Sequence, residues 1–326
     1  MWTIMKYLTW KRLINIVLLR LSFYLSRLTK KVILLGNPYF LSIEPVNFCN
    51  LHCPECPVGI GVSPSQKSVM SIDKYEKILE EQKKTLWYLI LYFQGEPLLH
   101  KQFHELVKFA HVRNIFTHTS SNAQLLTEEV AKELVLSGLD KLIVSIDGTT
   151  QDVYETYRVG GKLEKAVEGL KNIVEWKKRL RSKSPQVEVQ FIVLKTNEHQ
   201  LPGIKKMAKK WGANKVVLKT AQLYDYENGH PLMPSPKYSR YVQNTDGTYR
   251  LKKKIKNRCW KQWSGAVVTA DAKLLPCCFD KKAEHAFGQS DNKSLSEIWR
   301  NKKAMMFRQQ LLTNRKAVEM CRNCSE

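Results

Sequence analysis

The sequence predicts an α/β fold in which parallel strands alternate with helices. Six short apolar runs are rich in Ile, Val, Leu and aromatic residues, which is typical of buried parallel strands; they cover residues 41–46, 86–93, 114–120, 141–146, 187–194 and 215–218. Helical patterns lie between them at residues 71–84, 101–113, 127–137 and 163–181. The first helix has Ser71 and Asp73 near its N-cap. Six such units predict a barrel or an open α/β sheet.

The chain is long enough for one large domain and a smaller one, with 326 residues of which 43% are hydrophobic. We expect an N-terminal helix in residues 1–36, an α/β core in 37–227, a linker in 228–257 and a cysteine-rich domain in 258–326. The linker segment is rich in Pro, Gly, Asn and Lys.

The formal net charge is +23. This favours an anionic partner, which could be RNA, a phosphorylated or nucleotide-linked substrate or a membrane surface. A solvated basic surface explains the charge equally well.

The first 31 residues predict a basic amphipathic helix, because they carry seven Lys or Arg and no acidic residue. Apolar residues recur at helical spacing at Ile14, Val17, Leu18, Leu21, Leu25 and Leu28. Asn15 and Arg20 interrupt a run already too short to span a bilayer. We expect either a peripheral contact with an anionic membrane, in which the headgroups face Lys11, Arg12, Arg27 and Lys30, or docking of the stripe on the protein's own body or a partner.

Polar clusters follow four consecutive strands of the predicted sheet. A cysteine loop follows the first strand, residues 94–96 the second, residues 121–122 the third and residues 147–148 the fourth. Ligands bind at the carboxyl ends of parallel strands in both barrels and open sheets. We therefore expect these clusters to converge on one binding site.

Eight cysteines fall in two groups, 49/53/56 and 259/277/278/321/324, and no cleavable signal peptide precedes them. This clustering favours ligation of a metal or cluster in a reducing cytoplasm. Three thiolates leave one coordination position open, as a reactive site requires. The alternative is a zinc site completed by His52, His100 or His104.

The segment CNLHCPEC, residues 49–56, closely resembles the C-x3-C-x2-C loop of radical S-adenosylmethionine (SAM) enzymes. The resemblance implies a partial (β/α)6 TIM-like barrel in which Cys49, Cys53 and Cys56 ligate a [4Fe-4S] cluster. SAM binds the open iron and is cleaved to a 5′-deoxyadenosyl radical that abstracts hydrogen from the substrate. Such enzymes take their electron from a reductant such as flavodoxin or ferredoxin.

Further segments resemble the SAM-binding motifs of this family: QGEP at 94–97, SSNA at 120–123, SIDG at 145–148 and YRVGG at 157–161. By this resemblance SAM is bound by Gly95, Glu96, Asn122, Ser145 and Arg158. A carboxylate suits the SAM ammonium group, and a guanidinium suits its carboxylate. Taken singly, each residue could equally be structural. One departure is Glu55, which stands where the family usually has an aromatic residue, so adenine packing falls to Phe48 or His52.

The distal cysteines, in the pattern CW…PCCFD…CRNC, resemble the SPASM/twitch extension of radical SAM enzymes. The resemblance implies one auxiliary [4Fe-4S] cluster ligated by Cys259, Cys277, Cys321 and Cys324. Neighbouring residues in a hairpin face opposite ways, so one of Cys277 and Cys278 is spare. A structural zinc ion would suit four thiolates as well.

Three functions remain open on this basis. The first is radical oxidation or remodelling of a small polar metabolite, such as a sugar, a cyclitol or a lipid-linked group presented at a membrane. The resemblance to aminocyclitol dehydrogenases supports it, with Lys219 and Asp225 after the last strand as acid-base candidates. The second is a peptide-modifying SPASM maturase, although no winged leader-binding module is evident. The third is a zinc protein that binds RNA. We expect a cytoplasmic protein, with peripheral association at the inner face of the membrane as an option.

Overall fold

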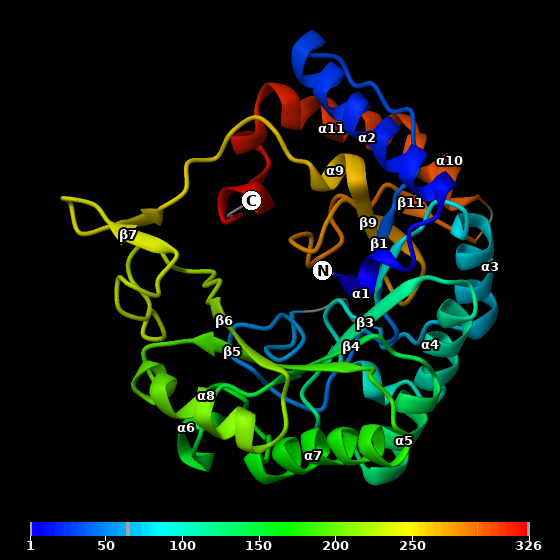
Figure 1. Cartoon of the computed structure of the whole chain (residues 1–326). Coiled ribbons are helices and arrows are strands. Elements are labelled where there is room, and N and C mark those ends of the chain that lie inside the picture. Colours follow the sequence, from blue (N-terminus) through cyan, green and yellow to red (C-terminus); the bar gives the residue numbers. More distant parts are fainter. Residues whose placement is uncertain (1, 63–65, 292, 325–326) are drawn as a thin grey trace.

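The computed structural model describes residues 2–62, 66–291 and 293–324, so the outermost ends of the expected terminal segments lie outside it. Its centre is a nine-stranded sheet in the order β11-β10-β9-β1-β2-β3-β4-β5-β6. Six of these strands run parallel in sequence order and confirm the predicted α/β class: β1 (Phe40–Ile43), β2 (Tyr88–Ile90), β3 (Phe116–Ser121), β4 (Lys141–Ser145), β5 (Gln186–Val193) and β6 (Lys215–Thr220). The sheet curves into an open barrel (Figure 1).

Helices cover the outer side of the curved sheet (Figure 1). They are α3 (Ile72–Gln82), α4 (Phe103–His111), α5 (Glu128–Leu136), α6 (Gln151–Tyr157), α7 (Leu163–Arg179) and α8 (Leu201–Lys210), with short 3₁₀ turns at Pro97–Leu99 and Glu198–Gln200. Ser71 and Thr127 cap α3 and α5 by accepting hydrogen bonds from backbone N–H groups. We did not predict α6 and α8. The Pro202-Gly203 pair resembles a turn in sequence, but proline is tolerated in the first turn of a helix.

The linker region contains a short hairpin of β7 (Tyr241–Gln243) and β8 (Tyr249–Leu251). The turn between them contains Gly247, which adopts a φ of +86°. The sequence predicted only a connection over residues 228–257. The two strands are only three residues long, so they leave little periodic signal.

The cysteine-rich segment continues the sheet of the barrel. It comprises α9 (Lys261–Ser264), β9 (Gly265–Val268), β10 (Lys273–Leu275), β11 (Gly288–Gln289), α10 (Leu295–Arg300), α11 (Lys302–Thr313), a 3₁₀ turn (Arg315–Ala317) and α12 (Glu319–Arg322). β9 pairs in parallel with β1. A Cβ at Gly265 would lie 2.3 Å from the ring of Phe40, so only glycine permits this close approach.

One buried carboxylate connects the barrel with this segment. Glu44 follows β1 and accepts hydrogen bonds from the backbone N–H groups of Gln94 and Ala270 at 3.2 and 3.1 Å. Burial raises the pKa of Glu44 to about 7, because the two hydrogen bonds offset only part of the desolvation.

The N-terminal segment forms α1 (Trp2–Met5) and α2 (Trp10–Thr29), and α2 packs against α9 and α11 on the outside of the molecule (Figure 1). The inward face of α2 carries Arg12, Asn15, Leu19, Ser22, Phe23 and Ser26. Much of the predicted apolar stripe is exposed instead, including Ile14, Val17 and Leu21. The expectation that the stripe docks on the protein's own body is therefore wrong.

We expected Arg12 to face lipid headgroups, and this prediction is also wrong. Its side chain is 2% exposed, and its guanidinium donates to the backbone carbonyls of Tyr7, Lys83, Arg113 and Asn114. A cluster of carbonyl groups can satisfy a buried guanidinium, which sequence periodicity does not reveal. Among the helices described, none combines the length and the apolar character needed to cross a bilayer.

Candidate active site

The three cysteines of the N-terminal loop line a cavity of about 510 Å³ at the carboxyl ends of the parallel strands. Cys53 is buried, whereas Cys49 and Cys56 are partly exposed. The loop is compact because Gly59 lies against it: a Cβ at Gly59 would be 2.4 Å from the carbonyl oxygen of Cys53. The sulfur of Cys49 accepts contacts from the N–H of Leu51 at 3.4 Å and from Asn122 Nδ2 at 3.7 Å.

Burial and the neighbouring thiols raise the pKa of Cys49 to about 12, and burial also raises the pKa of Cys53. The free thiols are therefore protonated near neutral pH, and binding of iron has to release their protons. Arg158 opposes the shift at Cys53, because a guanidinium stabilises the thiolate.

The donors around this cavity fit a cluster held by three thiolates. His100 is occupied, because its Nε2 lies 2.9 Å from the carbonyl of Met70 and its Nδ1 accepts from the N–H of Gln102. His104 lies 3.3 and 3.2 Å from Glu105 and Glu133. Neither histidine is free to complete a zinc site.

Gly95 and Glu96 lie in the turn that follows β2, at the wall of the same cavity. A Cβ at Gly95 would be 2.1 Å from the carbonyl oxygen of Val46, so the turn needs glycine to pass the segment after β1. Glu96 is 3% exposed and accepts hydrogen bonds from Ser121 Oγ at 2.7 Å and from the N–H of Asn122 at 2.8 Å. Burial raises the pKa of Glu96, and these hydrogen bonds offset only part of that effect.

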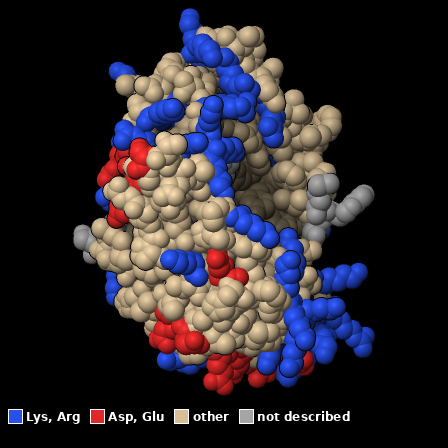
Figure 2. Space-filling view, turned by 90° about the vertical axis from the view of Figure 1, so that its left-hand side faces the viewer, with Lys and Arg blue, Asp and Glu red and all other residues tan. Residues whose placement is uncertain are grey.

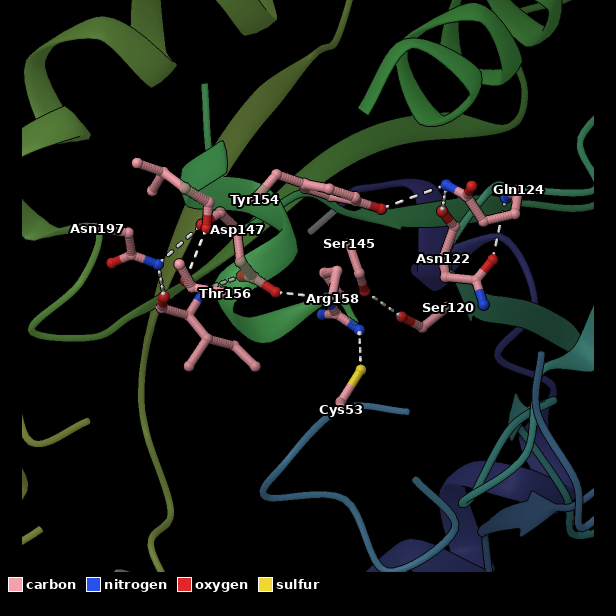
Figure 3. A network of polar contacts seen from close by, with 12 residues as sticks. Cys53, Ser120, Asn122, Gln124, Ser145, Asp147, Tyr154, Thr156, Arg158 and Asn197 are labelled. Carbon is pink, nitrogen blue, oxygen red and sulfur yellow. Dashed lines mark hydrogen bonds and ion pairs between the residues drawn. The ribbon is translucent and has the colours of Figure 1, made fainter. Parts of the chain in front are cut away.

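Arg158 reaches the cavity from the end of α6 and is held by a buried carboxylate (Figure 3). Its Nε donates to Asp147 Oδ2 at 2.6 Å, and its Nη1 lies 3.8 Å from the sulfur of Cys53. Burial alone would lower the pKa of Arg158, but Asp147 and Cys53 outweigh burial and raise it well above its ordinary value. The guanidinium is therefore charged, and Arg158 lines the cavity.

Asp147 is held in turn by its surroundings. Its Oδ1 accepts from the N–H of Ile192 at 2.5 Å, and Asn197 donates to its backbone carbonyl (Figure 3). We grouped Asp147 with the converging polar clusters but assigned it no function. Its contact with an arginine eleven residues later in the sequence is visible only in the fold.

Ser145 and Asn122 also line the cavity. Ser145 has one hydroxyl neighbour, whereas the side chain of Asn122 makes several hydrogen bonds. Ser145 ends β4, and its hydroxyl lies 3.4 Å from that of Ser120 (Figure 3). The Nδ2 of Asn122 donates to Asn50 Oδ1 at 2.8 Å as well as to Cys49, and its Oδ1 accepts from the N–H of Gln124. The side chain of Asn122 thus braces the cysteine loop.

Glu55, at the position where the sequence departs from the family pattern, fixes the cysteine loop to the segment after β6. One carboxylate oxygen accepts from the N–H of Tyr224 at 2.9 Å, and the other lies 3.2 Å from His230 Nε2. Tyr224 lines the cavity and has its pKa raised to about 12, mainly by burial, with smaller contributions from Cys56 and Glu55. An aromatic ring is therefore present near the third cysteine.

A second cavity of about 640 Å³ adjoins the first, and the two share Tyr92, Phe93, Lys219 and Cys278. Six of its sixteen lining residues are aromatic, including Tyr39, Phe40, Trp87 and Tyr88. Figure 2 shows a hollow in the surface with Lys and Arg along part of its edge. Lys219 thus lies where we expected it. Asp225 is exposed and lines neither cavity, so the structure does not bring it to the site.

The cysteine-rich segment contributes two side chains to the first cavity that the sequence did not place there, Cys278 and Lys281. The ammonium group of Lys281 lies 4.5 Å from the centre of the Phe93 ring. Cys278 packs against Phe93, Val267 and Leu275. The pairing of β9 with β1, which brings these residues to the barrel, leaves no signal in the local sequence.

The remaining distal cysteines are Cys259, Cys277, Cys321 and Cys324. Burial raises the pKa of Cys259, Cys277 and Cys321, and neighbouring thiols raise it further. Arg315 is 1% exposed and donates to the sulfur of Cys324 at 3.2 Å. Cys277 and Cys278 both line the second cavity, and only Cys278 also lines the first. Cys321 and Cys324 are buried and Cys259 and Cys277 are half-buried, and thiols beside a guanidinium suit an anionic cluster.

Two family models match the chain. The Radical SAM superfamily matches residues 43–182, and an iron-sulfur cluster-binding domain, SPASM, matches residues 259–325. The first range contains the cysteine loop and every expected SAM contact, and the second contains all five distal cysteines.

Similar proteins cover most of the chain. The tungsten-containing aldehyde ferredoxin oxidoreductase cofactor-modifying protein of Pyrococcus furiosus is 26% identical over 88% of this chain and 87% of its own. The PqqA peptide cyclase of Bradyrhizobium diazoefficiens is 26% identical over 82% of this chain and 74% of its own. The structure of Streptococcus suis SuiB bound to SAM superposes with a TM-score of 0.65 at 14% identity, over 94% of this chain and 76% of SuiB.

Proposed function

The chain belongs to the radical SAM superfamily and carries a C-terminal SPASM domain, and on this premise we propose that it modifies a peptide by abstracting hydrogen from an apolar or aromatic side chain. The superfamily assigns it SAM, a catalytic [4Fe-4S] cluster and auxiliary iron-sulfur ligation. When bound, the cluster and SAM supply a 5′-deoxyadenosyl radical. The electron comes from a reductant such as flavodoxin or ferredoxin.

In this proposal Cys49, Cys53 and Cys56 hold the catalytic cluster. Arg158 binds the SAM carboxylate through the N–H groups that Asp147 leaves free, and Glu96 accepts from the SAM ammonium group. An ionised carboxylate has about four acceptor positions, so Glu96 retains capacity beyond its present partners. Ser145 and the turn at Gly95 complete the SAM site, and Tyr224 packs on the adenine.

Cys259, Cys277, Cys321 and Cys324 hold one auxiliary cluster in the proposal. Arg315 would compensate the negative charge of their thiolates. Cys278 then faces the substrate side, where the neighbouring Lys219 and Lys281 are available to position or protonate a bound group.

The observation that carries the peptide assignment is the aromatic cavity beside the proposed SAM site. A sugar or cyclitol needs several hydrogen-bonding partners, since buried hydroxyl groups without partners are costly. The wall formed by Tyr39, Phe40, Trp87 and Tyr88 suits an apolar or aromatic side chain better. This observation favours the peptide alternative over the small polar metabolite that we expected first.

The free edge of β6 gives the peptide assignment further support. Within the described residues β6 pairs only with β5, and its last residues Lys219 and Thr220 line the first cavity. An extended peptide can add to such an edge by backbone hydrogen bonds and direct alternate side chains into the adjoining pockets. The name of the PqqA peptide cyclase agrees with a peptide substrate, while the Pyrococcus relative is named for a cofactor.

The experiment uses deuterium transfer, which can be measured while the substrate is still unidentified. Reconstituted holoenzyme is incubated without oxygen with SAM, dithionite and size fractions of a lysate from host cells grown in heavy water, and the 5′-deoxyadenosine is analysed by mass spectrometry. The fraction that transfers deuterium is expected to lose this ability after protease digestion. Transfer from a protease-resistant small-molecule fraction would contradict the peptide assignment.

A variant with Cys49, Cys53 and Cys56 changed to Ala is the control for background cleavage of SAM. It is expected to form no labelled 5′-deoxyadenosine in any fraction. Absence of SAM cleavage by the wild-type holoenzyme itself would contradict the enzymatic premise rather than the choice of substrate.

A further inference from the structure

The outward face of α2 is an exposed apolar stripe, which we define as Trp10, Leu13, Ile14, Val17, Leu21, Tyr24 and Leu28. These are seven of the nineteen large apolar residues that are exposed among the described residues, so exposure is concentrated on one helix. The exposed fractions reach 73% at Trp10 and 80% at Leu28. Contiguous apolar surface of this kind marks a binding surface.

The helix is fixed with this stripe facing outward. Two polar side chains anchor its inward face: Asn15 exchanges hydrogen bonds with the backbone of Asn37, and Ser22 accepts from the N–H of Leu35. Phe23 packs edge-on against Trp260 and Trp263, with ring centroids 5.4 Å apart in both pairs. Turning the stripe inward would break these contacts and expose Arg12, so the outward orientation is the one that the fold stabilises.

The surroundings of the stripe are strongly basic. No Asp or Glu precedes Glu44, whereas residues 1–31 contain seven Lys or Arg. Beside Phe23 and Tyr24 lies a pocket of about 420 Å³. Its described lining contains no carboxylate, and its cations are Arg27, Lys253, Lys254, Lys256, Arg258 and Lys261. We call this the basic pocket. It has the size and charge to take phosphate groups.

We propose that α2 lies flat in the interfacial region of an anionic lipid bilayer, with the apolar stripe among the upper acyl chains and the basic pocket against lipid phosphates. A helix of 20 residues is about 30 Å long and presents an interrupted apolar face, which suits an in-plane position. Trp10 and Tyr24 are residue types that are enriched at the level of the headgroups.

A bilayer fits this surface better than a protein partner does. A second copy of the chain would bring another net charge of +23, which opposes association. Protein interfaces are depleted in lysine, whereas this surface combines an apolar stripe with a lysine-rich pocket. Such a combination is typical of peripheral binding to anionic membranes.

The first test is cosedimentation of the holoenzyme with vesicles. Wild-type protein is expected to bind vesicles of phosphatidylglycerol mixed with phosphatidylcholine at least about tenfold more tightly than vesicles of phosphatidylcholine alone, and added salt should weaken binding. The double substitution Val17→Ser and Leu21→Ser is expected to lower the affinity for the mixed vesicles at least about tenfold, since each side chain loses apolar burial. The matched control is Val112→Ser with Leu136→Ser, which removes exposed apolar groups elsewhere.

The second test concerns the basic pocket. A triple variant with Lys253→Glu, Lys254→Glu and Lys256→Glu is expected to bind mixed vesicles at least about tenfold more weakly, since each cation near an anionic surface adds to binding. The control variant carries three Lys→Glu substitutions on α8, at Lys205, Lys206 and Lys209. This helix lies on the opposite side of the molecule (Figure 1).

Three results would overturn the membrane proposal. They are equal binding to neutral and mixed vesicles, unchanged binding after Val17→Ser and Leu21→Ser, or a lipid-free dimer that these substitutions convert to a monomer. The last result would assign the stripe to a second copy of the chain. Formation of 5′-deoxyadenosine is measured in every variant and is expected to be unchanged, which separates this proposal from the proposed enzymatic function.

Discussion

At the scale of single residues, the proposed SAM site depends on side chains whose partners hold them in place. Arg158 is oriented by Asp147, and Asp147 is held by the backbone N–H of Ile192. Asp147 is fully buried and the side chain of Arg158 is 13% exposed, so these contacts hold the guanidinium in place before any ligand binds (Figure 3). Preorganised donors lose little entropy on binding, which favours tight recognition of a carboxylate.

Replacing Arg158 by Lys tests its role in binding SAM. A lysine can keep the ion pair with Asp147 but cannot present a second pair of N–H groups to a carboxylate. We expect the dissociation constant for SAM to rise about 10- to 150-fold, as for the loss of a charged hydrogen bond of about 1.5–3 kcal/mol. Equilibrium dialysis at equal iron content measures it. Arg179→Lys, at an exposed arginine, is the control, and a change below about twofold at Arg158 would refute the assignment.

Replacing Gly95 by Ala tests the close approach of the turn after β2. The new Cβ would stand 2.1 Å from the Val46 carbonyl, so the backbone must shift. The cost of overpacking is about 1–3 kcal/mol, which predicts a fall of about 2–10 °C in the midpoint of thermal unfolding and a loss of iron from the cysteine loop. Gly203→Ala is the control, because its Cβ would meet only Thr149 at 3.9 Å. An unchanged unfolding midpoint in Gly95→Ala would show that the turn can accommodate a Cβ atom and would contradict this prediction.

At the scale of elements, sequence periodicity was sufficient to predict the six parallel strands and four of the helices around them. It also placed the cysteine loop and the turns at Glu96 and Asn122 after the correct strands, because apolar runs and their polar ends are local features. The orientation of α2 could not be predicted in this way. Its inward face is determined by backbone carbonyls, such as those that bind Arg12, and these come from distant parts of the chain.

The hairpin that carries Cys277 and Cys278 allows a comparison of two adjacent thiols. Cys277→Ser is expected to remove the auxiliary cluster and leave about four irons per chain, whereas Cys278→Ser should keep about eight. The reason is that burial and neighbouring thiols, Cys259 and Cys321 among them, raise the pKa of Cys277, whereas Cys278 lines the first cavity. Iron analysis and Mössbauer spectroscopy of the two anaerobically purified variants measure this difference. The reverse pattern would exchange their assignments.

The cysteine loop gives the complementary prediction. Changing Cys49, Cys53 and Cys56 to Ala should abolish SAM cleavage and leave the distal cluster intact, since no distal cysteine lines the first cavity except Cys278. The measurements are 5′-deoxyadenosine formation and the spectrum of the remaining cluster. Cleavage at the wild-type rate would exclude this loop as the catalytic site.

At the scale of the whole molecule, Glu44 makes stability depend on pH through the junction of the barrel and the cysteine-rich segment. Because the pKa of Glu44 is raised to about 7 by burial, the folded protein binds this proton more tightly than the unfolded chain does. Protonated Glu44 contributes about 3 kcal/mol to the free energy of unfolding. This contribution is fully present below about pH 4.5 and is lost as the pH rises to about 7.

The substitution Glu44→Gln removes this titration. The unfolding midpoint of the variant, relative to wild type, is expected to rise by several degrees between about pH 5 and pH 7.5. Differential scanning fluorimetry without oxygen measures the difference, and Glu164→Gln on the exposed face of α7 controls for loss of a carboxylate. A difference that does not vary with pH would mean that Glu44 is ionised throughout this range.

The parallel pairing of β9 with β1 has a consequence for biosynthesis. The first strand of the barrel leaves the ribosome early, but its partner at residues 265–268 follows only after all the other parallel strands. Until then one edge of β1 is open, and an open apolar edge is prone to join other chains. While translation continues, the cysteine loop therefore lies beside an incomplete sheet. We expect iron and sulfide to be inserted only after the finished chain is released.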